Sequence, residues 1–251
     1  MSHLPTHHIF PSPEAASEAL ASEIGDLVLR RASEGRPAVL GLATGSTPIR
    51  LYAELVRLHQ QGLSFSNVIT FNLDEYLGIG REHPESYWKF MHSHLFEHID
   101  IARENIHIPD GSISEEALEE YCDSYEKKIT ASGGLDLQVL GIGRNGHIGF
   151  NEPGAIADLL THVTELNPVT IRDAAHSFGG PDNVPQRAIT MGVKTILEAR
   201  RVVLLAFGHS KAEIVQRALT PGITAEVPAT YLQLHGNSAY FLDQEAGAHL
   251  E

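Results

Sequence analysis

The chain is poor in cysteine, in positive charge and in long apolar runs. Cys122 is the only cysteine among 251 residues, which excludes an intrachain disulfide and fits a reducing compartment. Only 18 lysines and arginines stand against 32 aspartates and glutamates, and this net charge of −14 argues against a nucleic-acid-binding protein. No apolar stretch approaches the roughly 18 residues that cross a bilayer, and the N-terminus lacks a signal-peptide pattern. We therefore expect a cytoplasmic protein without nucleic-acid or membrane partners.

The remaining composition, with 42% hydrophobic and 20% charged residues, is that of a globular domain. Apolar runs alternate with amphipathic stretches, which predicts βα units, a mainly parallel sheet and helices on both of its faces. Strands are expected over residues 38–42, 68–76, 137–140, 202–207 and 240–242. Helices are expected over residues 13–32, from 48 through 58, over 84–96 and 114–131, and after 211 to about 219.

No linker divides the chain, so residues 1–251 are interpreted as one domain. The ends, about residues 1–7 and 245–251, are expected to be flexible. His3, His7 and His8 are interpreted as loose polar terminal sequence rather than a metal site. Residues 155–187 are rich in turn formers, and a long irregular segment in a compact domain is often functional. We expect it to act as a lid.

The most informative segment, residues 141–152, has the sequence GIGRNGHIGFNE and directly follows the apolar run 137–140. Its glycines permit unusual backbone angles and close approach to a ligand. Asn145, His147 and Glu152 supply polar groups just beyond a strand end, where open α/β sheets bind ligands. His147 and Glu152 could instead satisfy loop and helix-end groups. The glycine density and the location favour a histidine that moves protons, with a carboxylate that orients it.

Two other strand ends carry polar groups. The turn Thr44, Gly45, Ser46 and Thr47 precedes a helix and suits a phosphate, although taken alone it favours a plain helix cap by Ser46 or Thr47. Lys211 follows another strand and could reach the same phosphate; the alternative is a solvated lysine in the first helical turn.

Asp74 and Glu75 end the expected strand 68–76 and, as neighbours in a strand, should point to opposite faces. At most one of them is expected to enter a site, where burial would raise its pKa and suit it to act as a general base. The other would be a surface charge or a structural hydrogen-bond acceptor. His94 and His98 have helical spacing but no third ligand nearby, so no metal site is expected.

These motifs resemble the glucosamine-6-phosphate deaminase (isomerase) family over about residues 37–243. The specific runs are LATGSTP at 42–48, FNLDEYLG at 71–78, HPESY at 83–87 and GIGRNGHIGFNEP at 141–153. The resemblance implies a Rossmann-like α/β fold and a deaminating hydrolase that uses aldose–ketose isomerisation. The implied reaction converts glucosamine-6-phosphate to fructose-6-phosphate and ammonia, with no metal or organic cofactor. Such proteins occur as monomers and as hexamers, so a homo-oligomer stays open.

The resemblance also implies roles for individual residues. Asp74 is the base that moves a proton between carbons 2 and 1, and His147 opens the sugar ring with help from Glu152. Asn145 occupies a ring-opening position that is Asp in some members. With Asn there, His147 keeps a partner that orients it, but its imidazolium loses a stabilising charge. The turn 44–47 and Lys211 form the phosphate site.

The segment after Pro153 departs from the family pattern. Leu159-Leu160-Thr161 replaces Ser-Arg-Thr, and Ser177-Phe178 replaces an Arg before an aromatic residue. The second arginine normally holds the phosphate, so Lys211, together with Arg172 or an arginine from elsewhere, must do so here. Allosteric activation is not expected, because the site that some members use lies in this region.

Two alternatives to the deaminase stay open. A hydrolase like 6-phosphogluconolactonase shares the fold and the phosphate turn, but it needs no base at carbon 2. A non-catalytic sugar-phosphate sensor would explain the missing arginines. The presence of Asp74, His147 and Glu152 disfavours that second alternative.

Overall fold

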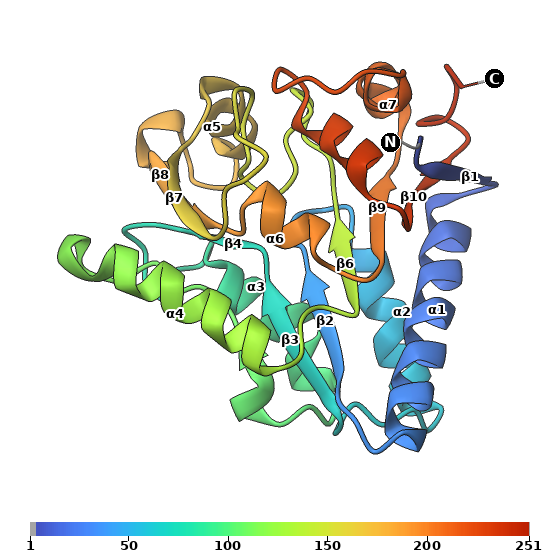
Figure 1. Cartoon of the computed structure of the whole chain (residues 1–251). Helices are drawn as coiled ribbons and strands as arrows, with labels where there is room; N and C mark the ends of the chain where they lie inside the picture. Colours follow the sequence, from blue (N-terminus) through green and yellow to red (C-terminus); the bar gives the residue numbers. More distant parts are fainter. Residues whose placement is uncertain (1–3, 251) are drawn as a thin grey trace.

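The structure is a computed structural model of the chain, and it describes residues 4–250. Its centre is a seven-stranded sheet in the order β1-β10-β9-β6-β2-β3-β5, and every neighbouring pair is parallel (Figure 1). The strands are β1 (Thr6–Phe10), β2 (Ala38–Leu42), β3 (Val68–Asn72), β5 (Ile106–His107), β6 (Leu137–Leu140), β9 (Val202–Ala206) and β10 (Ser238–Asp243). The expected α/β fold with a mainly parallel sheet is confirmed.

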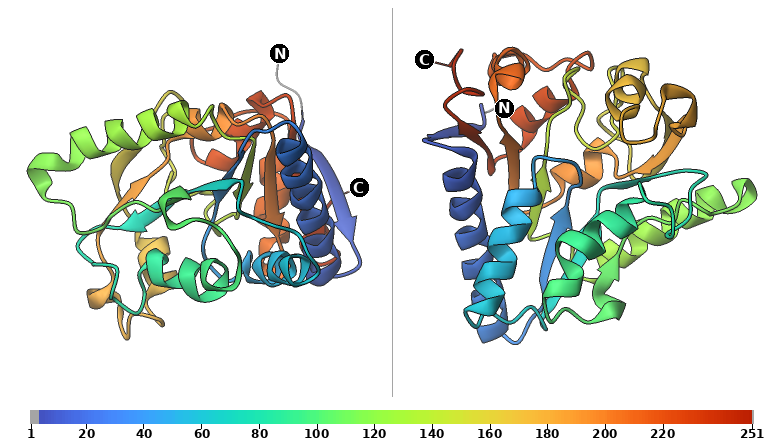
Figure 2. Two further views of the ribbon diagram at one scale, coloured as in Figure 1. Left: turned by 90° about the horizontal axis from the view of Figure 1, so that it is seen from below. Right: turned by 180° about the vertical axis from the view of Figure 1, so that it is seen from behind.

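Helices cover both faces of this sheet, as expected. One face packs against α1 (Pro13–Ser33), α2 (Ile49–Gln60) and α3 (Tyr87–His94), and Figure 2 shows α1 and α2 side by side. The other face packs against α4 (Leu118–Ala131), α6 (Val193–Leu197) and α7 (Ala212–Leu219). The central strands β2, β6 and β9 are buried along their whole length, which explains why they read as short, continuous apolar runs.

A second, three-stranded antiparallel sheet corrects two expectations. It has the order β4-β8-β7, with β4 at Asp74–Tyr76, β8 at Arg187–Thr190 and β7 at His162–Glu165. The expected strand 68–76 is therefore two strands in two sheets. Leu73 is the change-over point, because its N–H donates to Leu42 of β2 while its carbonyl accepts from Met191, just after β8. The segment 155–187, which was expected to be irregular, contains regular secondary structure, namely β7 and helix α5 (Pro168–Ala174).

The terminal segments within the described residues are not loose. His7 and His8 lie in β1, which pairs with β10 from Thr6 opposite Ala239 to Phe10 opposite Asp243. Near the other end, Ala246 is fully buried. The interpretation of His7 and His8 as loose terminal sequence is therefore wrong, His3 lies outside the described residues, and the flexibility of the ends stays a prediction. None of the helices in this described part is long and apolar enough to cross a membrane.

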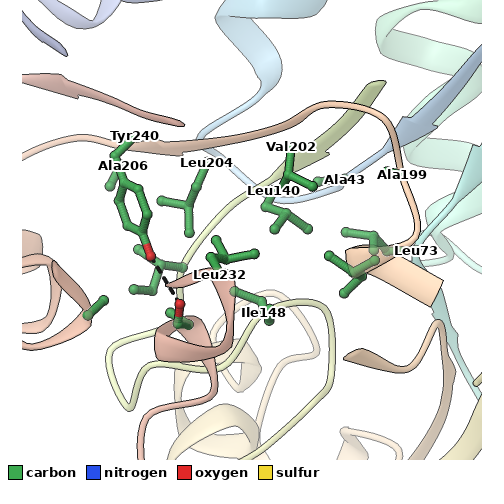
Figure 3. Close-up of a cluster of buried hydrophobic side chains, with 14 of the residues drawn as sticks. Ala43, Leu73, Leu140, Ile148, Ala199, Val202, Leu204, Ala206, Leu232 and Tyr240 are labelled. Carbon is green, nitrogen blue, oxygen red and sulfur yellow. Dashed lines mark hydrogen bonds between the residues drawn. The ribbon is translucent and has the colours of Figure 1, made fainter. Parts of the chain in front are cut away.

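One buried hydrophobic cluster anchors the three polar turns expected to form the site. Ala43, Leu73, Leu140 and Ile148 all belong to it (Figure 3). Each is the immediate chain neighbour of a site motif: Ala43 precedes Thr44, Leu73 precedes Asp74, Leu140 precedes Gly141, and Ile148 follows His147. Packing of these apolar side chains therefore fixes where the polar groups beside them point.

Candidate active site

A cavity of about 250 Å³ opens at the carboxyl ends of the central strands. β2 and β6 are neighbours there, and the chain leaves them in opposite directions: β3 lies beyond β2, whereas β9 and β10 lie beyond β6. Such a reversal of strand order is where open α/β sheets bind ligands. Most of the site residues expected from the sequence line this cavity, namely Thr44, Gly45, Ser46, Thr47, Asp74, His147 and Lys211. A larger cavity of about 710 Å³ near β5 is lined by none of them.

The turn before α2 is open to an anion. The residue that caps α2 is Pro48, whose side chain makes no capping hydrogen bond. The plain helix cap by Ser46 or Thr47 is therefore wrong. Gly45 has a φ of 99°, which favours glycine, and a Cβ placed there would meet nothing within 4 Å. Free backbone N–H groups at a helix N-terminus, beside open space, suit a phosphate.

Lys211 lies beside this turn at the end of a short 3-10 segment, His209–Lys211, that leads into α7. Its ammonium group donates to the carbonyl of Ile142, with 2.7 Å between Nζ and O. Partial burial lowers the pKa of Lys211, because the charged form is less well solvated there than in water. A half-buried cation that holds a single carbonyl has donors left for an anion, so the alternative of a fully solvated lysine is wrong.

Asp74 lies in β4 with 6% of its surface exposed and faces the same cavity. Burial, and after it the charge of Glu75, raises the pKa of Asp74 well above its ordinary value. A Cβ on Gly149 would lie only 3.4 Å from Asp74 Oδ2, so this carboxylate sits directly against the backbone of the segment 141–152. A carboxylate in this environment is a strong base whenever it is ionised.

Glu75 is buried and points away from the cavity. Its Oε1 accepts from Tyr76 N at 2.9 Å, and its Oε2 accepts from Trp88 N at 3.1 Å. Burial raises the pKa of Glu75 to about 7, although these backbone donors oppose the shift. Of the two roles left open for the carboxylate outside the site, the structural acceptor is therefore correct.

His147 is held by Glu152 on the side of its Nδ1, which lies 3.3 Å from Glu152 Oε2. Asn145 donates to the same Oε2 at 2.8 Å, and Thr170 of α5 donates to Oε1 at 2.5 Å. Burial alone would raise the pKa of Glu152, but the contacts with His147, Thr170 and Asn145 outweigh it and lower that pKa. Glu152 and Asn145 thus stand behind His147 and do not line the cavity.

The expected partnership between Asn145 and the imidazole needs correction. Asn145 Oδ1 accepts from the backbone N–H of His147, at 3.3 Å, while its amide is used by Glu152. The imidazole ring is instead placed by Glu152 and by Gly143. A Cβ on Gly143 would lie only 2.2 Å from the ring, so only glycine leaves the imidazole its position.

Five lining residues with polar side chains were not predicted as site residues from the sequence: Tyr76, Tyr87, Arg144, Thr170 and Asp173. Arg144 stands inside the segment 141–152, so its position gave a usable signal. Thr170 and Asp173 lie on α5, in the part expected to be irregular, and gave none. Leu160, Ser177 and Arg172 are exposed and do not line the cavity. Within residues 4–250, no three His, Cys, Asp or Glu side chains are grouped so as to hold a metal.

A model of the family described as glucosamine-6-phosphate isomerases/6-phosphogluconolactonase matches residues 11–241. The glucosamine-6-phosphate deaminase of Thermoanaerobacter sp. (strain X514) is 46% identical over 232 residues, which are 92% of this chain and 91% of that protein. The enzyme of the same name from Hahella chejuensis is 47% identical over 244 residues, 97% of this chain and 91% of that one.

Solved structures of both a deaminase and a lactonase are similar to this chain, but to different degrees. One described as a monomeric glucosamine-6-phosphate deaminase superposes with a TM-score of 0.93 at 42% identity, covering 97% of this chain and 99% of its own. The 6-phosphogluconolactonase of Trypanosoma brucei superposes with a TM-score of 0.80 at 21% identity and full coverage of both chains. The second similarity is one of fold alone.

Proposed function

The chain belongs to the glucosamine-6-phosphate isomerase/6-phosphogluconolactonase family, and on that basis we propose that it converts glucosamine-6-phosphate to fructose-6-phosphate and ammonia. The observation that carries this proposal is the placement of Asp74, a buried carboxylate with a raised pKa, in the same cavity as His147. Loss of an amine from carbon 2 of an aldose requires removal of a proton beside a carbonyl. A dry carboxylate is suited to that step.

The phosphate of the substrate binds at the turn 44–47 and Lys211, the anion-binding end of the cavity. Binding of this remote group orients the sugar toward Asp74 and His147. His147 Nδ1 is turned to Glu152, so Nε2 is left to serve the substrate. The imidazole takes the proton of the carbon-1 hydroxyl and returns a proton to the ring oxygen, which opens the pyranose to the aldehyde.

Asp74 then takes the proton from carbon 2 while the ammonium group of the substrate gives a proton to the carbon-1 oxygen, so that a neutral enolamine forms between carbons 1 and 2. The proton returns from Asp74 to carbon 1, and carbon 2 becomes an iminium. Water adds to carbon 2 and ammonia leaves, so a ketone replaces the amine. The whole reaction consumes one water. It therefore combines an isomerase-type proton transfer, carried by Asp74, with a final hydrolytic step.

The strongest alternative is a lactonase. Its support is the shared fold, but the structures described as lactonases match at 19–24% identity, whereas the deaminases match at 42–47%. We place the reaction in the cytoplasm, because a phosphorylated sugar is too polar to cross a membrane unaided.

The test is an assay of ammonia and fructose-6-phosphate released from glucosamine-6-phosphate, with galactosamine-6-phosphate and 6-phosphogluconolactone in parallel. We expect equimolar ammonia and fructose-6-phosphate from the glucosamine ester. Hydrolysis of the lactone without ammonia from either amino sugar would establish the lactonase instead. Tight binding of the amino-sugar phosphate without any product would establish a sensor.

A further inference from the structure

An arginine of the segment 141–152 and an aspartate of α5 meet across the cavity. Arg144 Nε donates to Asp173 Oδ2 at 2.9 Å, and a second hydrogen bond joins Nη2 to Oδ1. Both residues line the cavity together with Lys211 and the turn 44–47. The two parallel bonds make this a fork-to-carboxylate pair, the geometry in which guanidinium groups also bind phosphate.

The three charged groups are close enough to influence one another. The pKa of Lys211 is lowered chiefly by burial, while the charge of Asp173 raises it and the charge of Arg144 lowers it further. Asp173 is thus a carboxylate placed among the cations of a cavity that suits an anion. The pair is weakly held, because the Arg144 and Asp173 side chains are 56% and 40% exposed and water competes for both.

We propose that Arg144 is the second cationic ligand of the substrate phosphate, and that Asp173 occupies its guanidinium only while the phosphate is absent. This inference rests on the proposed function. On arrival, a phosphate held by the turn 44–47 and Lys211 displaces the Asp173 carboxylate, since it offers the same two acceptor oxygens with more negative charge. Arg144 thereby binds the phosphate in place of the lid arginine that this sequence lacks, since Ser177 and Arg172 lie outside the cavity.

The exchange of Asp173 for phosphate also changes how α5 is held against the segment 141–152. Asp173 stands three residues after Thr170, which donates to Glu152 behind His147. Release of Asp173 removes one of the ties between α5 and the segment 141–152, while the bond from Thr170 to Glu152 keeps another. Phosphate binding thus loosens the C-terminal end of α5 without removing the group that places Glu152.

Binding of inorganic phosphate, measured by titration calorimetry, tests the exchange without relying on turnover. Arg144→Ala is expected to weaken phosphate binding about 10-fold or more, as befits lost hydrogen bonds to a charged group. Asp173→Asn is expected to strengthen it several-fold, because the competing carboxylate is gone. Lys211→Ala, which should abolish binding, identifies the cavity as the place where phosphate binds. Arg172→Ala, one residue from Asp173 but outside the cavity, is the matched control and should bind phosphate as the unchanged protein does.

Phosphate binding within twofold of the unchanged protein in Arg144→Ala would overturn the inference, as would weaker binding in Asp173→Asn. For the amino-sugar phosphate, Arg144→Ala should raise KM by a similar factor and leave kcat nearly unchanged. The inference and the proposed function fail separately. If the variants bind phosphate in the expected order but the protein releases no ammonia, only the deaminase activity is rejected. If the protein is fully active but Arg144→Ala and Asp173→Asn bind phosphate as the unchanged protein does, only the role of Arg144 is rejected.

Discussion

Asn145 donates its side-chain amide to Glu152, with 2.8 Å between Nδ2 and Oε2, so this neutral residue supports a carboxylate. The contact keeps Glu152 ionised without placing a second negative charge in the segment 141–152. It also identifies the side chain that would respond to an Asp at this position: Glu152 directly, and the imidazole of His147 through Glu152.

Replacement of Asn145 by Asp should therefore change the pH dependence more than the turnover. Two carboxylates at hydrogen-bond distance hold one proton between them, which raises the pKa of the pair. We expect the acid limb of the kcat/KM profile to move to higher pH by about one unit. Asn145→Ala adds no charge and should leave the limb in place while lowering kcat about 10-fold. A limb that moves equally in both variants would contradict the charge argument.

Asp74→Asn should abolish turnover and preserve binding. The amide has nearly the shape of the carboxylate but cannot take a proton from carbon 2, so we expect kcat to fall about 10³-fold or more. Because Asp74 is buried and its pKa is raised, a neutral side chain also fits the site without loss of stability. Stopped-time product assays give kcat, and calorimetry with glucosamine-6-phosphate gives the affinity. Retained turnover would mean that another group is the base.

Glu75 should make the protein less stable as the pH rises. The carboxyl ionises near 4.5 in the unfolded chain but only at about 7 in the folded one, so the folded state binds more protons between these values. The free energy of unfolding consequently falls through this window, by about 2 kcal/mol between about pH 5 and about pH 8. Urea unfolding at both pH values should show this fall in the unchanged protein and a smaller one in Glu75→Gln. An equal fall in both would rule out Glu75 as a source.

Gly143→Ala should displace His147 selectively. The new methyl group would lie 2.2 Å from the imidazole, so the ring must shift away from Gly143. We expect kcat to fall about 100-fold, since a catalytic group moved by about 1 Å loses its alignment. Gly141→Ala is the control for the backbone, because its methyl group would meet no atom within 4 Å and Gly141 has no positive φ. A larger drop in melting temperature for Gly143→Ala than for Gly141→Ala, without loss of kcat, would contradict the expectation.

The strands that the sequence predicts well are the fully buried ones, because their residues are almost all apolar. β2 and β6 are apolar, short and followed by polar glycine-containing turns, so local pattern alone locates them. β1 has the sequence THHIF, which reads as polar terminus, and only its pairing with β10 makes it a strand. β7 and β8 were missed for the same reason, since each is stabilised chiefly by its neighbours in the second sheet.

The site residues likewise fall into those that local sequence predicts and those that only the tertiary fold brings to the cavity. Residues that follow buried strands, such as Thr44 and His147, are placed by sequence position and by the apolar neighbours that Figure 3 shows in the core. Thr170 and Asp173 reach the cavity only because α5 folds back over it. No periodicity in the sequence encodes that contact, because it joins residues of α5 to residues that lie 23 and 29 positions earlier in the chain.

The pairing of β1 with β10 sets a condition on synthesis of the chain. β10 is the strand beside β1 in the sheet, and Thr6 must wait for Ala239 to emerge from the ribosome before that ladder can form. At elongation rates of about 5–20 residues per second, the nascent chain carries the segment THHIF unpaired for some 10–50 seconds. Its polar start, Thr6 to His8, concealed the strand from sequence analysis and makes this waiting segment a weaker template for other nascent chains than a wholly apolar strand would be.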